Sequence, residues 1–485
     1  MDEHVASAPM TGAHIARFAS EVDAVRFPLI AAWLALACSV GAAHAEPRVV
    51  MISIDGLRPE VYRDPAELGL RAPNLVALRN EGASAERMIP VFPSVTYPAH
   101  SSLVTGTRPA EHGIVNNFVR GQEWYLNASD IRSPTLWQAA HAAGKTTAIV
   151  TWPATYGAQV DFLVPENLSF SVPDVRKLIR DGSTPGLFDE LENKCGKVQI
   201  PSFEALDAGE KLDAVTTCFA AEVLRRHKPD LLLVHYLDAD HRQHFAGVDS
   251  PEAKHAFERI DGFVGELRKA AKDAGVAEQT VFVIVGDHGF VPLHSSVNVN
   301  ALLLATGFAK LEAGKIVPSP DLRVSALGGS GAIYLREGAD PALAGRLESA
   351  LRVEIDRRYR DLVTLLPRAE LEAMGAFPGA ALGLASAEGY MLIAIDVPAP
   401  VLPSGALKGM HGYLPTVPGM ATGFIAAGPG IRRGVELPVV RQIDVAPTVA
   451  ALMGLRLEQA VGLPIPGVFE SKGQWPGIGS GEHRD

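Results

Sequence analysis

Stretches of continuous apolar residues alternate along the chain with stretches that have helical periodicity. Four short runs have the length and composition of buried strands, at residues 49–54, 147–151, 231–236 and 281–285. Between them, apolar residues are spaced for helices in three segments, at 135–143, 212–227 and 253–274. This alternation predicts an α/β fold in which a mainly parallel central sheet is sandwiched by helices.

Residues 1–45 have a different pattern. An apolar run at 27–43 follows two arginines and ends in small residues at 43–45. That order predicts a secretory signal peptide and therefore a periplasmic or secreted protein. The run is shorter than the roughly 20 residues of a membrane span, so no stable span is expected. An uncleaved anchor, lipidation at Cys38 and a start at Met10 remain alternatives.

The composition indicates which kinds of binding partner are expected. The 485 residues include 44 Lys and Arg against 55 Asp and Glu, a formal net charge of −11, and 47% of them are hydrophobic. A globular protein with a substantial core is indicated. Binding of a nucleic-acid polymer is not expected, because no basic cluster is evident. Beyond the signal segment only Cys195 and Cys218 remain, and either one disulfide or two buried thiols would fit.

Three acidic residues fall at the ends of predicted strands. These residues are Asp55, Asp240 and Asp287, and ligands gather at the carboxyl ends of parallel strands. Histidines accompany them: His288 is adjacent to Asp287, and His244 lies four residues after Asp240, on one face of a helix. Each residue alone fits a turn or a surface position. Together with a loop histidine, His411, they have the carboxylate and imidazole chemistry of a zinc site.

Thr96 lies in a short turn between Pro93 and Pro98. A helix start follows at residues 101–104, so the hydroxyl is expected close to free backbone N–H groups, where anions bind. Taken alone, Thr96 could also be an ordinary helix cap.

The pattern also suggests domain boundaries. Residues 46–294 are expected to form the first part of a catalytic α/β domain, and residues 404–466 its final part. Residues 295–403 are less regular and would form a small cap subdomain. Gly328-Gly329-Ser330-Gly331, within this segment, has the spacing of turns rather than of a nucleotide-binding loop. Residues 467–485 are rich in Gly and Ser and are expected to be a flexible tail.

In their order, these motifs resemble the nucleotide pyrophosphatase/phosphodiesterase family of the alkaline phosphatase superfamily. The matching positions are Asp55, 92–100 with Thr96, 105–109, 112–117, Thr151-Trp152-Pro153, Asp240-x-x-x-His244, Asp287-His288-Gly289, His411-Gly412-Tyr413, 421–430 and 440–454. They run from about residue 48 to 456 and cover nearly the whole chain after the signal segment.

The resemblance implies two Zn²⁺ ions and a threonine nucleophile. The ligands of one ion would be Asp55, Asp287 and His288, with Thr96 beside them. The ligands of the other would be Asp240, His244 and His411. Asn117 and the Thr96 backbone N–H would hold a phosphoryl oxygen, and the substrate contacts would be Tyr97, Trp152 and Tyr236. The implied protein is an exported phosphodiesterase or nucleotide pyrophosphatase. It would cleave small, nucleotide-like phosphate diesters through a phosphothreonine intermediate.

Some residues depart from the family pattern. Gly286, Gln243 and Ala154 stand where Ser, Gly and Gly are common, and Asp238 is a rival to Asp240 as a ligand. Only Asp240 keeps the spacing to His244. These departures put the substrate in doubt more than the reaction.

Three other functions compete with this interpretation. A sulfatase would need Cys or Ser at the Thr96 position and Arg at His100, so it is disfavoured. A phosphomonoesterase or phosphonate hydrolase would share the metal ligands, but residues 151–157 contain no Lys or Arg to bind a dianionic phosphate. A non-catalytic zinc-dependent binding protein is a remote alternative, against which the complete ligand set argues.

Overall fold

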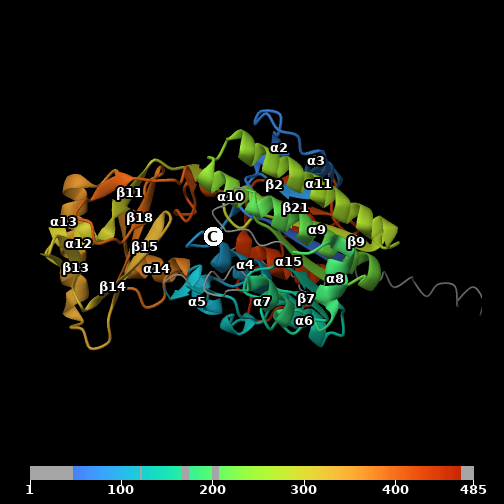
Figure 1. The fold of residues 1–485 in the computed structure, drawn as a ribbon, viewed down its shortest axis with the longest axis horizontal. Helices are drawn as coiled ribbons and strands as arrows, with labels where there is room; N and C mark the ends of the chain where they lie inside the picture. Colours follow the sequence, from blue (N-terminus) through green and yellow to red (C-terminus); the bar gives the residue numbers. More distant parts are fainter. Residues whose placement is uncertain (1–46, 121–122, 167–173, 199–206, 471–485) are drawn as a thin grey trace, which may run out of the picture. The chain divides into compact units, whose positions relative to one another are not determined.

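A computed structural model describes residues 47–120, 123–166, 174–198 and 207–470. Its centre is an eight-stranded sheet in the order β22-β2-β21-β9-β1-β8-β6-β7 (Figure 1). The strands are β1 (Arg48–Ile54), β2 (Ala83–Ala85), β6 (Thr147–Val150), β7 (Phe162–Val164), β8 (Leu231–Tyr236), β9 (Thr280–Val285), β21 (Phe424–Ala427) and β22 (Val435–Leu437). Only β21 runs against its neighbours in this sheet, since it pairs antiparallel with both β9 and β2. The predicted mainly parallel sheet is therefore confirmed.

Side chains alternate along β1 and divide the core into two layers. Val50 and Ile52 pack into the cluster on one face of the sheet, and Val49 and Met51 into the cluster on the other. The helices on the first face are α3 (Pro73–Glu81), α8 (Leu187–Cys195), α9 (Ala208–His227) and α11 (Pro251–Asp273). Those on the second face are α4 (Thr96–Thr105), α6 (Leu136–Ala142) and α15 (Val445–Leu452). The sheet is thus covered on both faces, as predicted.

The predicted helices correspond to α6, α9 and α11, with small shifts at their ends. Helix α9 begins at Ala208 rather than at residue 212. Polar side chains fix two of the starts: the Thr135 hydroxyl accepts the Gln138 N–H before α6, and the Ser250 hydroxyl accepts the Ala253 N–H before α11.

Shorter elements connect these parts, and some of them position site residues. Outside the sheet, β3 (Met88–Ile89) pairs with β23 (Val440–Arg441), β4 (Phe118–Arg120) with β5 (Glu123–Trp124), and β10 (Val291–Pro292) with β20 (Gly409–Met410). Further helices are α2 (Glu60–Arg63), α5 (Pro109–His112), α7 (Val175–Gly182) and α10 (Asp238–Phe245). Single 3-10 turns occur at Ala128–Asp130, Ala277–Gln279, Pro418–Met420, Gln442–Asp444 and Pro466–Val468. The ligand candidates after β8 lie on α10, and His411 directly follows β20.

The strands assigned within residues 295–403 pair with one another. They are β11 (Ser295–Asn298), β12 (Ala309–Glu312), β13 (Lys315–Pro318), β14 (Leu322–Leu327), β15 (Ser330–Leu335), β16 (Val363–Pro367), β17 (Leu382–Ser386), β18 (Tyr390–Ile393) and β19 (Val401–Pro403). With α12 (Val299–Ala305) and α13 (Ala342–Arg358) they enclose a core of their own, and α14 (Arg368–Met374) packs on β16 and β17. The proposed cap begins with β11 and ends with β19, which pair with each other, and its status as a subdomain remains a prediction.

Gly328 and Gly329 form the turn between β14 and β15, as expected, while Ser330 and Gly331 begin β15. The turn also reaches the site, because the Gly329 N–H donates to the His411 carbonyl oxygen at 2.9 Å. An added Cβ at Gly328 would lie 2.3 Å from that same oxygen. Glycine is needed here for close approach to the histidine loop.

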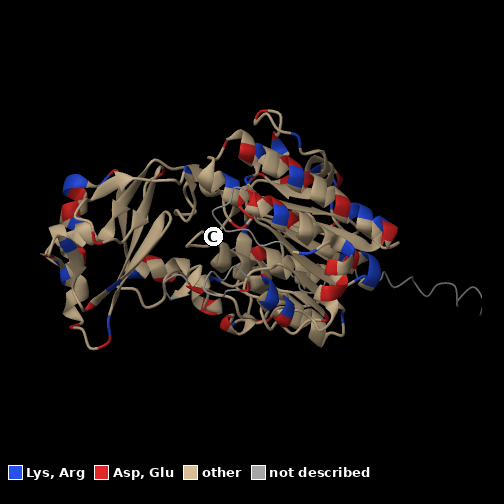
Figure 2. Cartoon of the chain, in the orientation of Figure 1, with Lys and Arg blue, Asp and Glu red and all other residues tan. Residues whose placement is uncertain are grey.

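Acidic and basic side chains are interspersed on the long helices α11 and α13 (Figure 2). Pairs four residues apart, such as Lys269 with Asp273 and Glu348 with Arg352, neutralise one another locally.

The carboxyl-terminal prediction needs a correction. Residues up to Glu470 are described, and Val468 and Phe469 are buried against the second face of the sheet. Their apolar side chains hold the chain there, so the tail cannot begin at residue 467. The signal peptide, Cys38 and residues 471–485 lie outside the described residues. Within the described part, no helix combines the length and apolar character that crossing a membrane requires.

Cys195 and Cys218 form a disulfide. It joins the end of α8 to the middle of α9, with the two Cα atoms 5.8 Å apart. Of the two alternatives left open by the sequence, the bridge is the correct one.

Candidate metal and phosphoryl-transfer site

Three neighbouring strands bring their acidic residues to one edge of the sheet. Strand β1 lies between β8 and β9 in parallel register, so Asp55, Asp240 and Asp287 follow adjacent strand ends. The Asp287 carboxylate accepts the Gly56 N–H at 3.0 Å, which ties the loop after β9 to the loop after β1.

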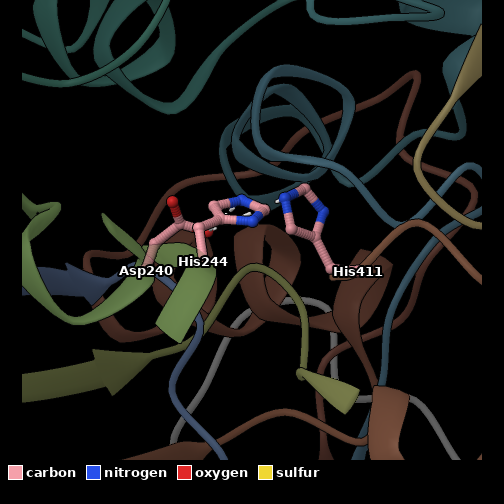
Figure 3. A group of neighbouring side chains, drawn as sticks. All are labelled: Asp240, His244 and His411. Carbon is pink, nitrogen blue, oxygen red and sulfur yellow. Dashed lines mark ion pairs between the residues drawn. The ribbon is translucent and has the colours of Figure 1, made fainter. Parts of the chain in front are cut away.

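Asp240, His244 and His411 form one group whose ligand atoms all lie within 4.8 Å of one another (Figure 3). Oδ1 of Asp240 is 3.5 Å from Nε2 of His244 and 3.7 Å from Nε2 of His411. The Nδ1 atoms of the two histidines face the carbonyl oxygens of Gly409 and Ser94, at 3.0 and 3.3 Å. Donation from Nδ1 to a carbonyl leaves Nε2 as a lone-pair donor, which is the form that binds a metal.

A second group consists of Asp55, Asp240 and His288. Nε2 of His288 lies 3.3 Å from Oδ1 of Asp55 and 3.1 Å from Oδ2 of Asp287. The rings of His288 and His411 stack with centroids 3.6 Å apart, so the two groups are adjacent. Asp240 belongs to both groups, whereas the resemblance assigned it to one ion only.

The electrostatics of this cluster suit a divalent cation. Oδ1 of Asp55, Oδ1 of Asp240 and Oδ2 of Asp287 are buried without a hydrogen-bond partner among the described residues. Burial, reinforced by the charges of Asp287 and Asp240, raises the pKa of Asp55 well above its usual value. Burial also raises the pKa of Asp240 to about 6. Carboxylates crowded in this way need a positive charge nearby, and oxygen and imidazole donors of this kind are those that zinc accepts.

Two of the histidines are held in the neutral form that a metal requires. Burial lowers the pKa of His244 to about 4. Burial, with the neighbouring His288 and His244, lowers the pKa of His411 well below its usual value. No proton therefore competes for their Nε2 lone pairs near neutral pH.

Thr96 is the first residue of α4, and Val95 occupies the cap position. Its Oγ1 lies 3.5 Å from Nε2 of His288, so the hydroxyl faces the second metal group instead of capping the helix. Asn117 is next to it, since its Oδ1 accepts the Tyr97 N–H at 3.0 Å. The amide is thereby fixed, and its Nδ2 remains a donor for a ligand.

The expected substrate contacts need correction. Tyr236 is completely buried in the core on the α9 face, and its hydroxyl pairs with Thr217. Because neighbouring residues of a strand point to opposite faces, His235 reaches the site in its place. Trp152 is also completely buried, and Tyr97 is covered by Trp124 with its hydroxyl bonded to Glu166. None of the three rings presents a free face, so we do not retain them as substrate contacts.

Asp238, the rival ligand, is used elsewhere. Its carboxylate pairs with Arg242 at 3.1 Å and with Arg259 at 2.5 Å. Gln243 has a structural role, because its amide donates to the Gly56 carbonyl at 3.1 Å. Gly286 is required by its surroundings, since an added Cβ would lie 2.0 Å from Oγ1 of Thr422.

Sequence reasoning missed two site residues, His235 and Glu166. Both are buried, and His235 lies between the carboxylates of Asp55 and Glu166. Burial alone would lower the pKa of His235, but hydrogen bonds to both carboxylates outweigh it and raise that pKa well above its usual value. A histidine inside an otherwise apolar strand was the available signal for His235. Glu166 offered none, because it follows an ordinary short strand.

Comparison with known proteins decides the family. A family model described as type I phosphodiesterase / nucleotide pyrophosphatase matches residues 49–368. The chain belongs to this family. Membership agrees with the resemblance inferred from the motifs.

Curated relatives are about a quarter identical to this member of the family over the segments that align. An uncharacterized pyrophosphatase/phosphodiesterase of Schizosaccharomyces pombe is 29% identical over 258 residues, which cover 50% of this chain and 45% of the relative. Ectonucleotide pyrophosphatase/phosphodiesterase family member 1 of Rattus norvegicus is 25% identical over 254 residues, covering 50% and 24%. Human family member 7 is 23% identical over 260 residues, covering 50% and 48%. The chain therefore matches about half the length, or less, of these relatives.

Solved structures share the fold. Human ectonucleotide pyrophosphatase / phosphodiesterase 5 aligns with a TM-score of 0.62 at 18% identity, covering 87% of this chain and 100% of that one. An inactive variant of the murine protein, in complex with AMP, aligns with a TM-score of 0.61 at 18% identity, covering 86% and 97%. The alkaline phosphatase-like fold expected from the sequence agrees with these similarities.

Proposed function

We propose that the chain is an exported, two-zinc phosphodiesterase or nucleotide pyrophosphatase with Thr96 as its nucleophile. The observation that carries this proposal is the position of Thr96. Its hydroxyl lies beside His288, in the second of two adjacent ligand groups that share Asp240.

One ion would be held by Asp55, Asp287 and His288, and the other by Asp240, His244 and His411. Oδ2 of Asp287 is included because it is buried, unpartnered and 3.1 Å from Nε2 of His288. When bound, the ions would neutralise phosphoryl charge and lower the pKa of the Thr96 hydroxyl and of the attacking water.

The chain's own groups would orient the reaction. Thr96 stands at the amino end of α4, where its backbone N–H has no acceptor within the helix and would attract a phosphoryl oxygen. Asn117 offers its Nδ2 to the same oxygen, since its Oδ1 is already engaged by the Tyr97 N–H. Together these donors would stabilise the charge that grows on phosphorus oxygens in the transition state.

The reaction has two steps, formation of a phosphothreonine and its hydrolysis. In the first, Oγ1 of Thr96 loses its proton and bonds to phosphorus, the bond to one ester oxygen breaks, and that leaving oxygen takes up a proton. In the second, water bonds to phosphorus and the bond to Oγ1 breaks, which restores the threonine. With a diester as substrate, the phosphothreonine intermediate keeps the second ester group.

The decisive experiment is to trap this intermediate. Purified protein is mixed with an aryl phosphodiester, quenched in acid within one turnover and digested for mass spectrometry. We expect the peptide that contains Thr96 to carry the phosphoryl group with its remaining ester. Turnover without any covalent adduct on that peptide, together with full activity after Thr96→Ala, would reject the mechanism.

A further inference from the structure

A continuous series of buried hydrogen bonds leads from the metal group to the residue after the nucleophile. Oδ2 of Asp55 lies 3.2 Å from Nε2 of His235, and Nδ1 of His235 lies 2.9 Å from Oε1 of Glu166. The Tyr97 hydroxyl donates to Oε2 of Glu166 at 2.7 Å. At most 4% of each of these four residues is exposed, so water does not compete for the bonds.

Each contact in the series is made through a defined atom. Nε2 of His235 faces Asp55 and Nδ1 faces Glu166, so each ring nitrogen has one carboxylate partner. Each Glu166 oxygen then has one partner, His235 or Tyr97. Oδ2 of Asp55 is occupied, while Oδ1 has no partner among the described residues and lies 3.3 Å from Nε2 of His288. The carboxylate is therefore held with one defined oxygen toward the metal group.

The same series ends beside the nucleophile. Tyr97 follows Thr96, and its backbone N–H holds the Asn117 amide. A second contact supports the arrangement: the His100 ring packs against His235 with centroids 4.4 Å apart, and Nδ1 of His100 lies 2.8 Å from the Thr96 carbonyl oxygen. One buried network thus contacts a ligand carboxylate at one end and the first turn of α4 at the other.

We propose that His235 and Glu166 are positioning residues. They hold Asp55 so that one of its oxygens faces the metal, and they fix its position relative to the first turn of α4, which carries Thr96. This proposal rests on the proposed two-metal site, and it concerns how tightly that site binds zinc. Partners that hydrogen-bond to a ligand typically alter metal affinity or activity by roughly 10–100-fold when they are replaced. A network that serves folding only would change stability and leave zinc affinity unaltered.

The test compares two buried histidines in the full chain. In His235→Gln the side chain has no pair of ring nitrogens that can contact both carboxylates, so Asp55 loses its orientation. His112→Gln is the matched control, because His112 is also completely buried and hydrogen-bonded to Ser102 of α4, but it touches no ligand candidate. Each protein is stripped of metal, and Zn²⁺ affinity is measured by competition with a chromogenic chelator, alongside thermal unfolding and steady-state kinetics.

We expect His235→Gln to raise the dissociation constant of one of the two Zn²⁺ ions by about 10-fold or more. His112→Gln should keep the unsubstituted Zn²⁺ affinity, even if its melting temperature falls. Added zinc should restore kcat of His235→Gln while KM stays near the unsubstituted value. Wild-type zinc affinity in His235→Gln, or an equal loss in His112→Gln, would overturn the proposal.

Glu166→Gln gives a second measurement if His235→Gln does not fold. The amide can accept only at one atom, so one bond of the network is lost and a smaller loss of affinity in the same direction is expected. Unaltered affinity in this variant would also overturn the proposal. Failure of the proposed function is distinguishable, since it would appear as absent zinc binding or absent turnover in the unsubstituted protein.

Discussion

Oγ1 of Thr96 lies 3.5 Å from Nε2 of His288, although the two residues are 192 positions apart in the chain. Thr96 begins α4, one of the helices on the second face of the sheet, and His288 follows β9, the strand next to β1. Their meeting depends on packing the start of α4 against the carboxyl edge of the sheet. That edge is where parallel α/β sheets bind their ligands.

Thr96→Ala should lower kcat/KM for an aryl phosphodiester by roughly 10³-fold or more, because it removes the nucleophile. Fold and most zinc binding should persist, since the side chain contributes no core packing. Steady-state kinetics, circular dichroism and zinc analysis test this. Thr105→Ala, on the same helix, is the control and should stay active. An undiminished rate in Thr96→Ala would show that another group attacks phosphorus.

Metal content should distinguish Asp240 from His411. Asp240 contributes to both ligand groups, so Asp240→Ala should lower occupancy of both ions, whereas His411→Ala should empty one and leave the other partly filled. Elemental analysis of the purified variants measures this. His294→Ala replaces an exposed histidine and should keep the full content. Fewer than two ions in active, unsubstituted enzyme would contradict the two-metal proposal.

An aryl phosphodiester should have a higher kcat/KM than the matching monoester. A dianionic monoester needs more positive charge than two metal ions supply, and residues 151–157 provide no Lys or Arg. A diester carries one negative charge fewer. Initial rates on both compounds at one pH and zinc concentration decide the matter, and a clear preference for the monoester would assign the chain to a different activity.

Loss of the Cys195–Cys218 bridge should lower the free energy of unfolding by about 3 kcal/mol, because a cross-link 23 residues apart restricts the unfolded chain. Chemical denaturation of a Cys195→Ser, Cys218→Ser double variant measures the difference. Mass spectrometry of the unreduced protein that found both thiols free would refute the bridge.

The exported protein should begin near Glu46, because residues 17–45 have the basic, apolar and small-residue order of a signal peptide. Amino-terminal sequencing of protein recovered outside the cytoplasm tests this expectation. Recovery of exported protein that still carried residues before Phe27 would contradict it.

Much of the site could be predicted because its information is local. Asp240 and His244 share a helical face through their spacing of four, and that spacing favours Asp240 over Asp238 as a ligand. The ion pairs of Asp238 with Arg242 and Arg259 agree with this choice. The apolar runs likewise defined β1 and β8 almost to the residue. The acidic residues that follow these strands then predict a site at the carboxyl edge of a parallel sheet.

Other features depend on contacts between distant segments. Period-two alternation shows that His235 and Tyr236 point to opposite faces of β8, but only the packed helices decide which face adjoins Asp55. Glu166 follows an ordinary short strand, and its role arises from the approach of Tyr97 and His235. Asp240 belongs to both ligand groups because its carboxylate lies within 4.8 Å of the ligand atoms of each, and such distances arise only in the folded chain. The sequence by itself determined the strands, the helices and the kinds of ligand, because these follow from local periodicity and side-chain chemistry. The tertiary structure decided which ligands converge and which side chains orient them, because those distances are set by how the layers pack.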